Sequence, residues 1–201
     1  MAPSHICIRL FAFCLLPFHG FHGLNGYRSF SDDRTSLTDE ECGGFDNLSV
    51  HFGDYYFDCG QEVPLDQVNT QAPTVAYKKA DESEKYLIAM VDPDAPYEDD
   101  PIYRSWLHWI VANVNGGDLL AGDTSGGDTF MKYAPPSPPK PKPGSQNDHR
   151  YFIYVFKQKQ ELDSSAQVAD RKSFDIDEYR EKLDLEPVAM NMFSTHRPEV
   201  L

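Results

Sequence analysis

The chain has 201 residues, of which 40% are hydrophobic and 13% aromatic. This composition is too apolar for wholesale disorder and is sufficient for one folded domain with tails. Asp and Glu outnumber Lys and Arg by 32 to 18, which gives a formal net charge of −14. Because contacts to nucleic-acid phosphates need clustered cations, the charge argues against a nucleic-acid partner and against an anionic membrane surface.

The N-terminus predicts a secretory signal peptide over residues 1–23. Arg9 is followed by an uncharged, mainly apolar run from Leu10 to Phe18. A short apolar run behind a positive residue is typical of such a leader and is too short to span a bilayer. The alternative is a disordered or interfacial terminus. No later segment is long and apolar enough to cross a membrane, so we expect a secreted, extracellular protein.

Cleavage of this leader would leave two cysteines, Cys42 and Cys59. In an oxidising compartment an even pair of cysteines can form a disulfide, and we expect this bridge. Two unpaired thiols are the alternative. The tripeptide Asn47-Leu48-Ser49 is a sequon for N-glycosylation, which agrees with secretion but adds little support on its own.

Residues 24–44 are polar and glycine-rich and predict a mobile lead-in to a single domain over residues 45–201. Strand signals in that domain lie at 48–52, 74–77, 86–91, 107–112 and 151–156. The last three runs are continuously apolar, which is typical of strands buried on both faces. Clusters of Gly, Asn and Asp predict turns between them, for example at 115–118 and 123–128.

Helix signals are confined to the C-terminal part of the chain. Asp175 can cap a helix, with Glu178 three residues later as in a capping box. Ile176, Tyr179 and Leu183 then share one helical face. The pattern predicts a mainly β domain, in the α+β class, with one late helix.

Four motifs that carry polar, chemically active side chains follow one another along the domain. They are Asp-Pro-Asp-Ala-Pro at 92–96, Trp-Leu-His at 106–108, Tyr-Ala-Pro-Pro-Ser-Pro-Pro at 133–139 and His-Arg-Tyr at 149–151. This ordered set resembles the phosphatidylethanolamine-binding protein family, which includes the Raf kinase inhibitor and plant flowering regulators. The resemblance covers about residues 45–193.

The resemblance implies a β-sandwich with a small anion pocket at one end, where the family holds a phosphate-bearing head group. By motif position, the ligand-binding residues would be Asp92, His108, Ser137 (through a nearby backbone N–H), His149 and Tyr151. Supporting residues would be Asp94, Pro96, Trp106, Tyr133 and Arg150. The chemistry agrees, because imidazole N–H and phenol O–H groups donate to phosphate oxygens and a carboxylate can orient a histidine.

We therefore expect non-enzymatic binding of phosphate-bearing ligands such as phospholipid head groups, with no cofactor. One alternative is a protein-interaction module that inhibits a protease or kinase. Another is a metal site with two histidines and one carboxylate, built from Asp92, His108 and His149. The proline-rich stretch 135–143 predicts a stiff surface loop, although its PxxP spacing could also dock on an aromatic groove.

The leader makes a direct prediction about the mature chain. We expect it to begin near residue 21 or 24, after the small residues Gly20 or Gly23, because signal peptides end at small residues. N-terminal sequencing of secreted protein measures this. Recovery of intact Met1 from a cytosolic fraction would contradict the prediction.

Overall fold

The computed structural model describes residues 36–40 and 42–198, and the predicted leader lies outside these residues. Two β-sheets form its framework, which confirms the predicted mainly β fold. None of the helices in the described residues is long and apolar enough to cross a membrane. The larger sheet has the strand order β1 (Asp46–Asn47), β10 (Glu186–Thr195), β9 (His149–Gln158), β6 (Lys85–Asp92), β7 (Trp106–Asn115), β8 (Asp128–Met131), with β4 (Gln61–Glu62) also paired to β10. The smaller sheet has the order β3 (Tyr55–Tyr56), β2 (Ser49–Phe52), β5 (Thr74–Ala76).

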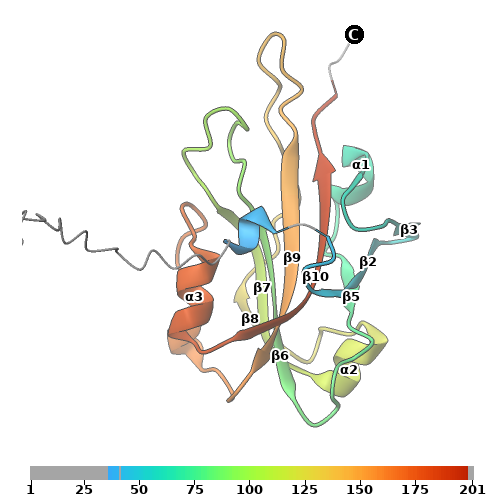
Figure 1. The fold of residues 1–201 in the computed structure, drawn as a ribbon, viewed down its shortest axis with the longest axis vertical. Helices are drawn as coiled ribbons and strands as arrows, with labels where there is room; N and C mark the ends of the chain where they lie inside the picture. Colours follow the sequence, from blue (N-terminus) through green and yellow to red (C-terminus); the bar gives the residue numbers. More distant parts are fainter. Residues whose placement is uncertain (1–35, 41, 199–201) are drawn as a thin grey trace, which may run out of the picture. The chain divides into compact units, whose positions relative to one another are not determined.

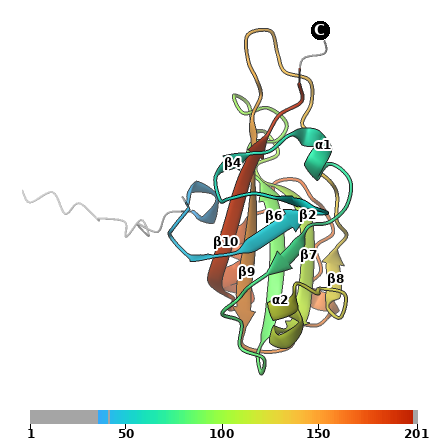
Figure 2. The ribbon, with the colours of Figure 1, turned by 90° about the vertical axis from the view of Figure 1, so that its right-hand side faces the viewer.

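The central strands of the larger sheet are buried on both faces. In β6, Ile88 belongs to a core cluster that also contains Val50 of the smaller sheet. The next residue, Ala89, points to the opposite face and belongs to a cluster that contains Ile176 of the late helix α3 (Ile176–Lys182). Figure 1 shows α3 on one face of the larger sheet and β2 with β5 on the other, and Figure 2 looks onto the face that carries the smaller sheet. Burial on both faces explains why these strands read as continuous apolar runs.

The late helix begins as the sequence predicts. The side chain of Asp175 accepts hydrogen bonds from the backbone N–H groups of Asp177 and Glu178 at 2.9 Å each. These bonds satisfy two N–H groups that have no partner inside the helix. The cap therefore fixes where α3 starts.

The predicted turn at 115–118 is wrong, because Gly116–Ala121 form a short helix, α2. Two glycines at its start conceal the helix signal, since glycine is a poor helix former. Packing requires Gly116, because a Cβ atom there would lie 1.8 Å from the backbone oxygen of Asp81. Helix α1 (Leu65–Val68) and the 3-10 turn η2 (Ser164–Ala166) are also too short to show periodicity in the sequence.

Packed structure extends further toward the N-terminus than the predicted domain start at residue 45. Leu37–Asp39 form a 3-10 turn, η1, and Leu37 is buried in the core. The hydroxyl of Tyr154 in β9 donates a 2.6 Å hydrogen bond to the carbonyl oxygen of Leu37. This part of the predicted lead-in is thus held against the larger sheet.

The structure pairs Cys42 with Cys59, as expected from the sequence. The two cysteines are separated by 17 positions, and closing a loop of that size in the unfolded chain stabilises the fold by about 3 kcal/mol. We expect the double variant Cys42→Ser/Cys59→Ser to lower the free energy of unfolding by about that amount in denaturant titration. Thiol counting on mature, unreduced protein should find neither cysteine free; two free thiols per chain would refute the bridge.

Candidate functional site

Three strands of the larger sheet meet around a cavity. β6 lies between β9 and β7 and is antiparallel to both, so its C-terminal end adjoins their N-terminal ends. At this level Val91 pairs with Leu107 on one side and with Phe152 on the other. The cavity, called the pocket below, has a volume of about 190 Å³. It is lined by Asp92, Ala95, Pro96, Tyr103, Trp106, His108, Ser137, Pro138, Pro139, His149 and Tyr151.

The structure brings together all of the residues predicted to contact a ligand. The pocket is lined by Asp92, His108, Ser137, His149 and Tyr151. Of the residues predicted to support them, Pro96 and Trp106 also line the pocket, whereas Asp94, Tyr133 and Arg150 do not. Tyr133 instead packs edge-on against Trp109.

An irregularity in β7 places His108 at the pocket. Met90 of β6 pairs with Trp109, whereas the next residue, Val91, pairs with Leu107. His108 is therefore an extra residue in the ladder between the two strands. Extra residues of this kind change the direction of a side chain and are frequent beside functional sites.

The imidazole ring of His108 is fixed through one nitrogen. Its Nδ1–H donates a 2.6 Å hydrogen bond to the carbonyl oxygen of Ala134. The carbonyl oxygen of His108 itself accepts from the backbone N–H of Ala134 at 2.9 Å and from Arg171 at 3.0 Å. Burial lowers the pKa of His108, so the ring is neutral at pH 7 with its proton on Nδ1. The other nitrogen, Nε2, has no hydrogen-bond partner among the described residues.

His149 and Asp92 form a buried ion pair. Nδ1 of His149 lies 2.7 Å from Oδ2 of Asp92, and Nε2 lies 3.2 Å from the carbonyl oxygen of Pro96. Both partners only accept hydrogen bonds, so both ring nitrogens carry protons and His149 is an imidazolium ion. Burial lowers the pKa of His149, but the hydrogen bond to Asp92 and the negative charges of Asp92 and Asp94 outweigh it, and the net effect is a raised pKa.

The second aspartate of the 92–96 motif holds an arginine instead of facing the pocket. Nε and Nη2 of Arg150 donate to the two carboxylate oxygens of Asp94 at 2.9 and 2.8 Å. The backbone N–H of Asp94 in turn donates to Oδ1 of Asp92 at 2.8 Å. These bonds join the motif at 92–96 to the motif at 149–151 through the ion pair of Arg150 with Asp94.

Tyr151 presents an unpaired hydroxyl from a rigid position. Its ring stacks on Phe193 with the ring centroids 5.0 Å apart. It also forms a T-shaped contact with the ring of His108, with the centroids 5.1 Å apart. Burial raises the pKa of Tyr151 well above its ordinary value, so the hydroxyl stays protonated. Nothing in the described part of the chain forms a hydrogen bond with it, which leaves it as a donor for a ligand.

The proline loop, residues 135–143, forms the facing wall through Ser137. Its position is fixed at Pro138, whose carbonyl oxygen accepts a 2.9 Å hydrogen bond from Nε of Arg197. The stiff surface loop expected from the sequence thus also encloses a cavity.

Two residues at the site were not found from the sequence. Tyr103 lines the pocket, with its ring centroid 6.1 Å from that of Trp106. Arg171 supports the irregular part of β7 from a loop that is distant in the sequence. Tyr103 lies three residues before Trp106 of the Trp-Leu-His motif and could have been singled out as a neighbour, but no local pattern marks Arg171.

The three candidate metal ligands do not form a metal site. Both ring nitrogens of His149 are engaged in hydrogen bonds, and one of them binds the carboxylate of Asp92. Across residues 36–40 and 42–198, no group of three or more His, Cys, Asp or Glu side chains is arranged to hold a metal ion.

Comparison with known proteins agrees with this geometry. Residues 52–193, more than half of the chain, match the family described as phosphatidylethanolamine-binding protein. The chain belongs to this family. A Drosophila melanogaster protein named "Putative odorant-binding protein A5" is 35% identical over 127 residues, which are 60% of this chain and 56% of that protein. The chain therefore spans little more than half the length of this relative.

Solved structures share the fold. A phosphatidylethanolamine-binding protein from Plasmodium vivax superposes with a TM-score of 0.65 at 19% identity, over 77% of this chain and 88% of that one. A carboxypeptidase Y inhibitor, solved in complex with its cognate proteinase, superposes with a TM-score of 0.62 at 22% identity, over 75% and 83% of the two chains.

The raised pKa of His149 predicts how stability depends on pH. Above its unfolded value of about 6.5, the folded protein still binds a proton that the unfolded chain releases, so the free energy of unfolding falls as pH rises through the folded pKa. The lowered pKa of His108 acts in the opposite direction and only below about pH 6.5. We expect His149→Gln to remove the fall on the alkaline side in denaturant titrations between pH 6 and 9. In the wild-type protein, NMR should show the His149 ring titrating above 6.5; titration below that value would contradict the assignment.

Proposed function

We propose that this chain is a non-enzymatic binding protein that takes a small phosphate-bearing ligand, such as a phospholipid head group, into the pocket. The observation that carries the proposal is the unpaired state of His108 Nε2 and of the Tyr151 hydroxyl within the described structure. Ser137 adds an exposed hydroxyl and a backbone N–H from the facing wall. The remaining lining of the pocket is mainly apolar and comprises Ala95, Pro96, Tyr103, Trp106, Pro138 and Pro139.

The size of the pocket favours a head group over a whole lipid. Its volume of about 190 Å³ is smaller than the roughly 300–1,000 Å³ of sites that hold drug-sized ligands. A phosphate placed against His108 and Tyr151 would leave its ester substituent against the apolar part of the lining.

A proton should enter the pocket with the phosphate. Neutral His108 holds its proton on Nδ1, so Nε2 can only accept a hydrogen bond. An ionised phosphate oxygen also only accepts. A close contact between the two therefore requires a proton, which either makes His108 an imidazolium ion or stays on a phosphomonoester, whose second pKa is about 6. A phosphodiester has no such proton to bring, so His108 must take one from solvent.

We expect the affinity for a phosphodiester, such as glycerophosphoethanolamine, to fall as pH rises from 5.5 to 8, by up to about tenfold per pH unit where one proton is taken up. Titration calorimetry in buffers of different ionisation enthalpy measures this uptake directly. Tyr151→Phe should weaken binding by roughly 10- to 150-fold, the effect of losing a hydrogen bond to a charged group. His108→Gln should abolish the uptake.

The matched control is Tyr154→Phe. Tyr154 lies on β9, as Tyr151 does, but it belongs to the core cluster on the α3 side of the larger sheet, and its hydroxyl donates to the carbonyl oxygen of Leu37. This variant should keep the wild-type affinity. Unchanged affinity in Tyr151→Phe and His108→Gln, with binding still present, would place the ligand elsewhere and refute the proposed site.

We also propose that the protein is secreted. The Cys42–Cys59 disulfide supports this, because disulfides persist in oxidising compartments. The relative named for odorant binding supports both an extracellular location and a function in binding without catalysis. The apolar leader before residue 24 agrees with the same assignment.

Inhibition of a protease is the second candidate function. Its support is the carboxypeptidase Y inhibitor, which shares the fold and was solved with its proteinase. Ile102, which is 61% exposed, and the proline loop supply surface for a protein partner close to the pocket. Absence of phosphate-ligand binding throughout the calorimetric series would favour this candidate.

A further inference from the structure

The sequon Asn47-Leu48-Ser49 joins β1, at the outer edge of the larger sheet, to β2 of the smaller sheet. Leu48 is fully buried, and its backbone N–H donates to the carbonyl oxygen of Met190 at 3.1 Å. Its carbonyl oxygen accepts a 2.8 Å hydrogen bond from the side chain of Asn191. Because side chains alternate along an extended chain, this anchoring of Leu48 turns Asn47 and Ser49 outward together, and both are exposed.

A groove of about 380 Å³ opens beside the sequon. It lies where β10 is covered by two short strands, since β1 pairs with Ala189–Met190 and β4 pairs with Phe193–Ser194. Asn191 lies between these two pairings. The polar and aromatic residues that line the groove include Asn47, Ser49, Tyr56, Asp58, Gln61 and Asn191.

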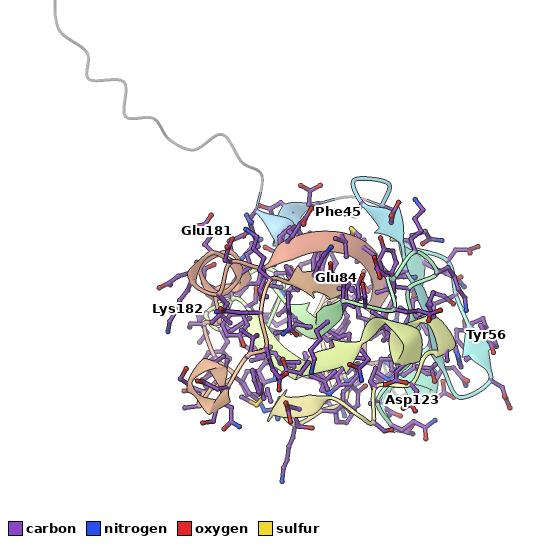
Figure 3. The ribbon with its side chains drawn as sticks, turned by 90° about the horizontal axis from the view of Figure 1, so that it is seen from below. Phe45, Tyr56, Glu84, Asp123, Glu181 and Lys182 are labelled. Atoms are coloured by element: carbon purple, nitrogen blue, oxygen red, sulfur yellow. A yellow bond between two sulfur atoms is a disulfide. The ribbon has the colours of Figure 1, made fainter. Side chains whose placement is uncertain are left out.

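The chemistry of this groove suits a sugar ring. Tyr56 is 67% exposed and lies at the outer margin of the smaller sheet in Figure 3. Its ring stacks on that of His51, with the ring centroids 4.4 Å apart. Gln61 uses its side-chain oxygen to accept from the backbone N–H of Asp58 at 3.2 Å, which leaves its NH2 group for another acceptor. A pyranose ring has apolar C–H faces that pack on aromatic rings and a rim of hydroxyls that both donate and accept.

We propose that Asn47 carries an N-linked glycan and that its first N-acetylglucosamine lies in this groove, against Tyr56 and within hydrogen-bonding reach of Asp58 and Gln61. The proposal rests on the secretion proposed above, because the glycan is attached in the secretory pathway. The sugar would cover an edge of the larger sheet that only two-residue strands protect. Exposed sheet edges are sites where a further strand can add, so the glycan would oppose association between copies of the chain.

The glycan is tested on the full chain expressed in secreting insect cells. Mass spectrometry of protein from medium and cells should find one N-glycan, and peptide N-glycosidase should remove it and convert Asn47 to Asp. Asn47→Gln and Ser49→Ala should lose the glycan, whereas the matched variant Ser49→Thr should keep it, because Thr restores the acceptor hydroxyl. Secreted protein with an unmodified Asn47 would overturn the glycan and leave secretion standing; retention in the cytosol with intact Met1 would overturn both.

The position of the sugar is tested with Tyr56→Ala. This variant keeps the sequon, so the fraction of glycosylated chains should not change. Release of the glycan from native protein by the glycosidase should become several-fold faster, because the sugar loses its aromatic wall. The matched control is Ile102→Ala, which removes another exposed large hydrophobic side chain but lies outside the groove and should leave the rate unchanged. Equal release rates for wild type and Tyr56→Ala would overturn the placement in the groove.

Discussion

The buried ion pair between Asp92 and His149 determines how the rest of the pocket is arranged. Each side chain is about 2–3% exposed, and the bond between them is 2.7 Å long. A charge in such a position must be paired, because loss of one partner leaves an isolated buried charge that costs several kcal/mol. The pairing is possible because β6 and β9 are antiparallel neighbours, which brings the end of one to the start of the other. Both ring nitrogens of His149 are thereby engaged within the fold, so the proposed ligand contacts are left to His108 and Tyr151.

The two histidines have opposite properties because their surroundings differ. His149 faces a carboxylate and a carbonyl oxygen, which favour the charged ring despite burial. His108 has a carbonyl partner on one nitrogen only, and burial together with the nearby charge of Arg171 favours the neutral ring. The pocket therefore holds one ring whose charged form is favoured and is neutralised by Asp92, and one ring whose neutral form is favoured. The proposed proton-linked binding rests on this asymmetry and not on the presence of two histidines as such.

The sequence predicted the strands that carry the site, because 86–91, 107–112 and 151–156 are apolar throughout and are buried on both faces. It also predicted the cap at Asp175, which depends only on neighbouring residues. It could not show that His108 is an extra residue in the β6–β7 ladder, since that depends on the register between strands. The roles of Arg171 and of Asp94 likewise depend on contacts between distant segments. The sequence did not show helix α2, because Gly116 is a poor helix former. A glycine is needed there because the residue packs closely on the backbone of Asp81, and this tertiary contact cannot be inferred from the sequence.

A strongly acidic chain can still hold an anion, because its charge is distributed unevenly around the pocket. Four carboxylates at this end of the larger sheet are paired with cations, as Asp92–His149, Asp94–Arg150, Asp99–Lys142 and Asp39–Arg104. Other acidic residues lie away from the pocket. Glu84, labelled in the view from below in Figure 3, directly precedes β6, and the opposite end of β6 is Asp92 at the pocket. A strand from Lys85 to Asp92 spans roughly 25 Å at about 3.3 Å per residue. Charges are screened over about 8 Å at physiological ionic strength, so acidic residues at the far end repel a bound phosphate only weakly. For the proposed phosphate ligand, the groups within one screening length therefore matter most, and His108 and Tyr151 supply the unpaired polar atoms there.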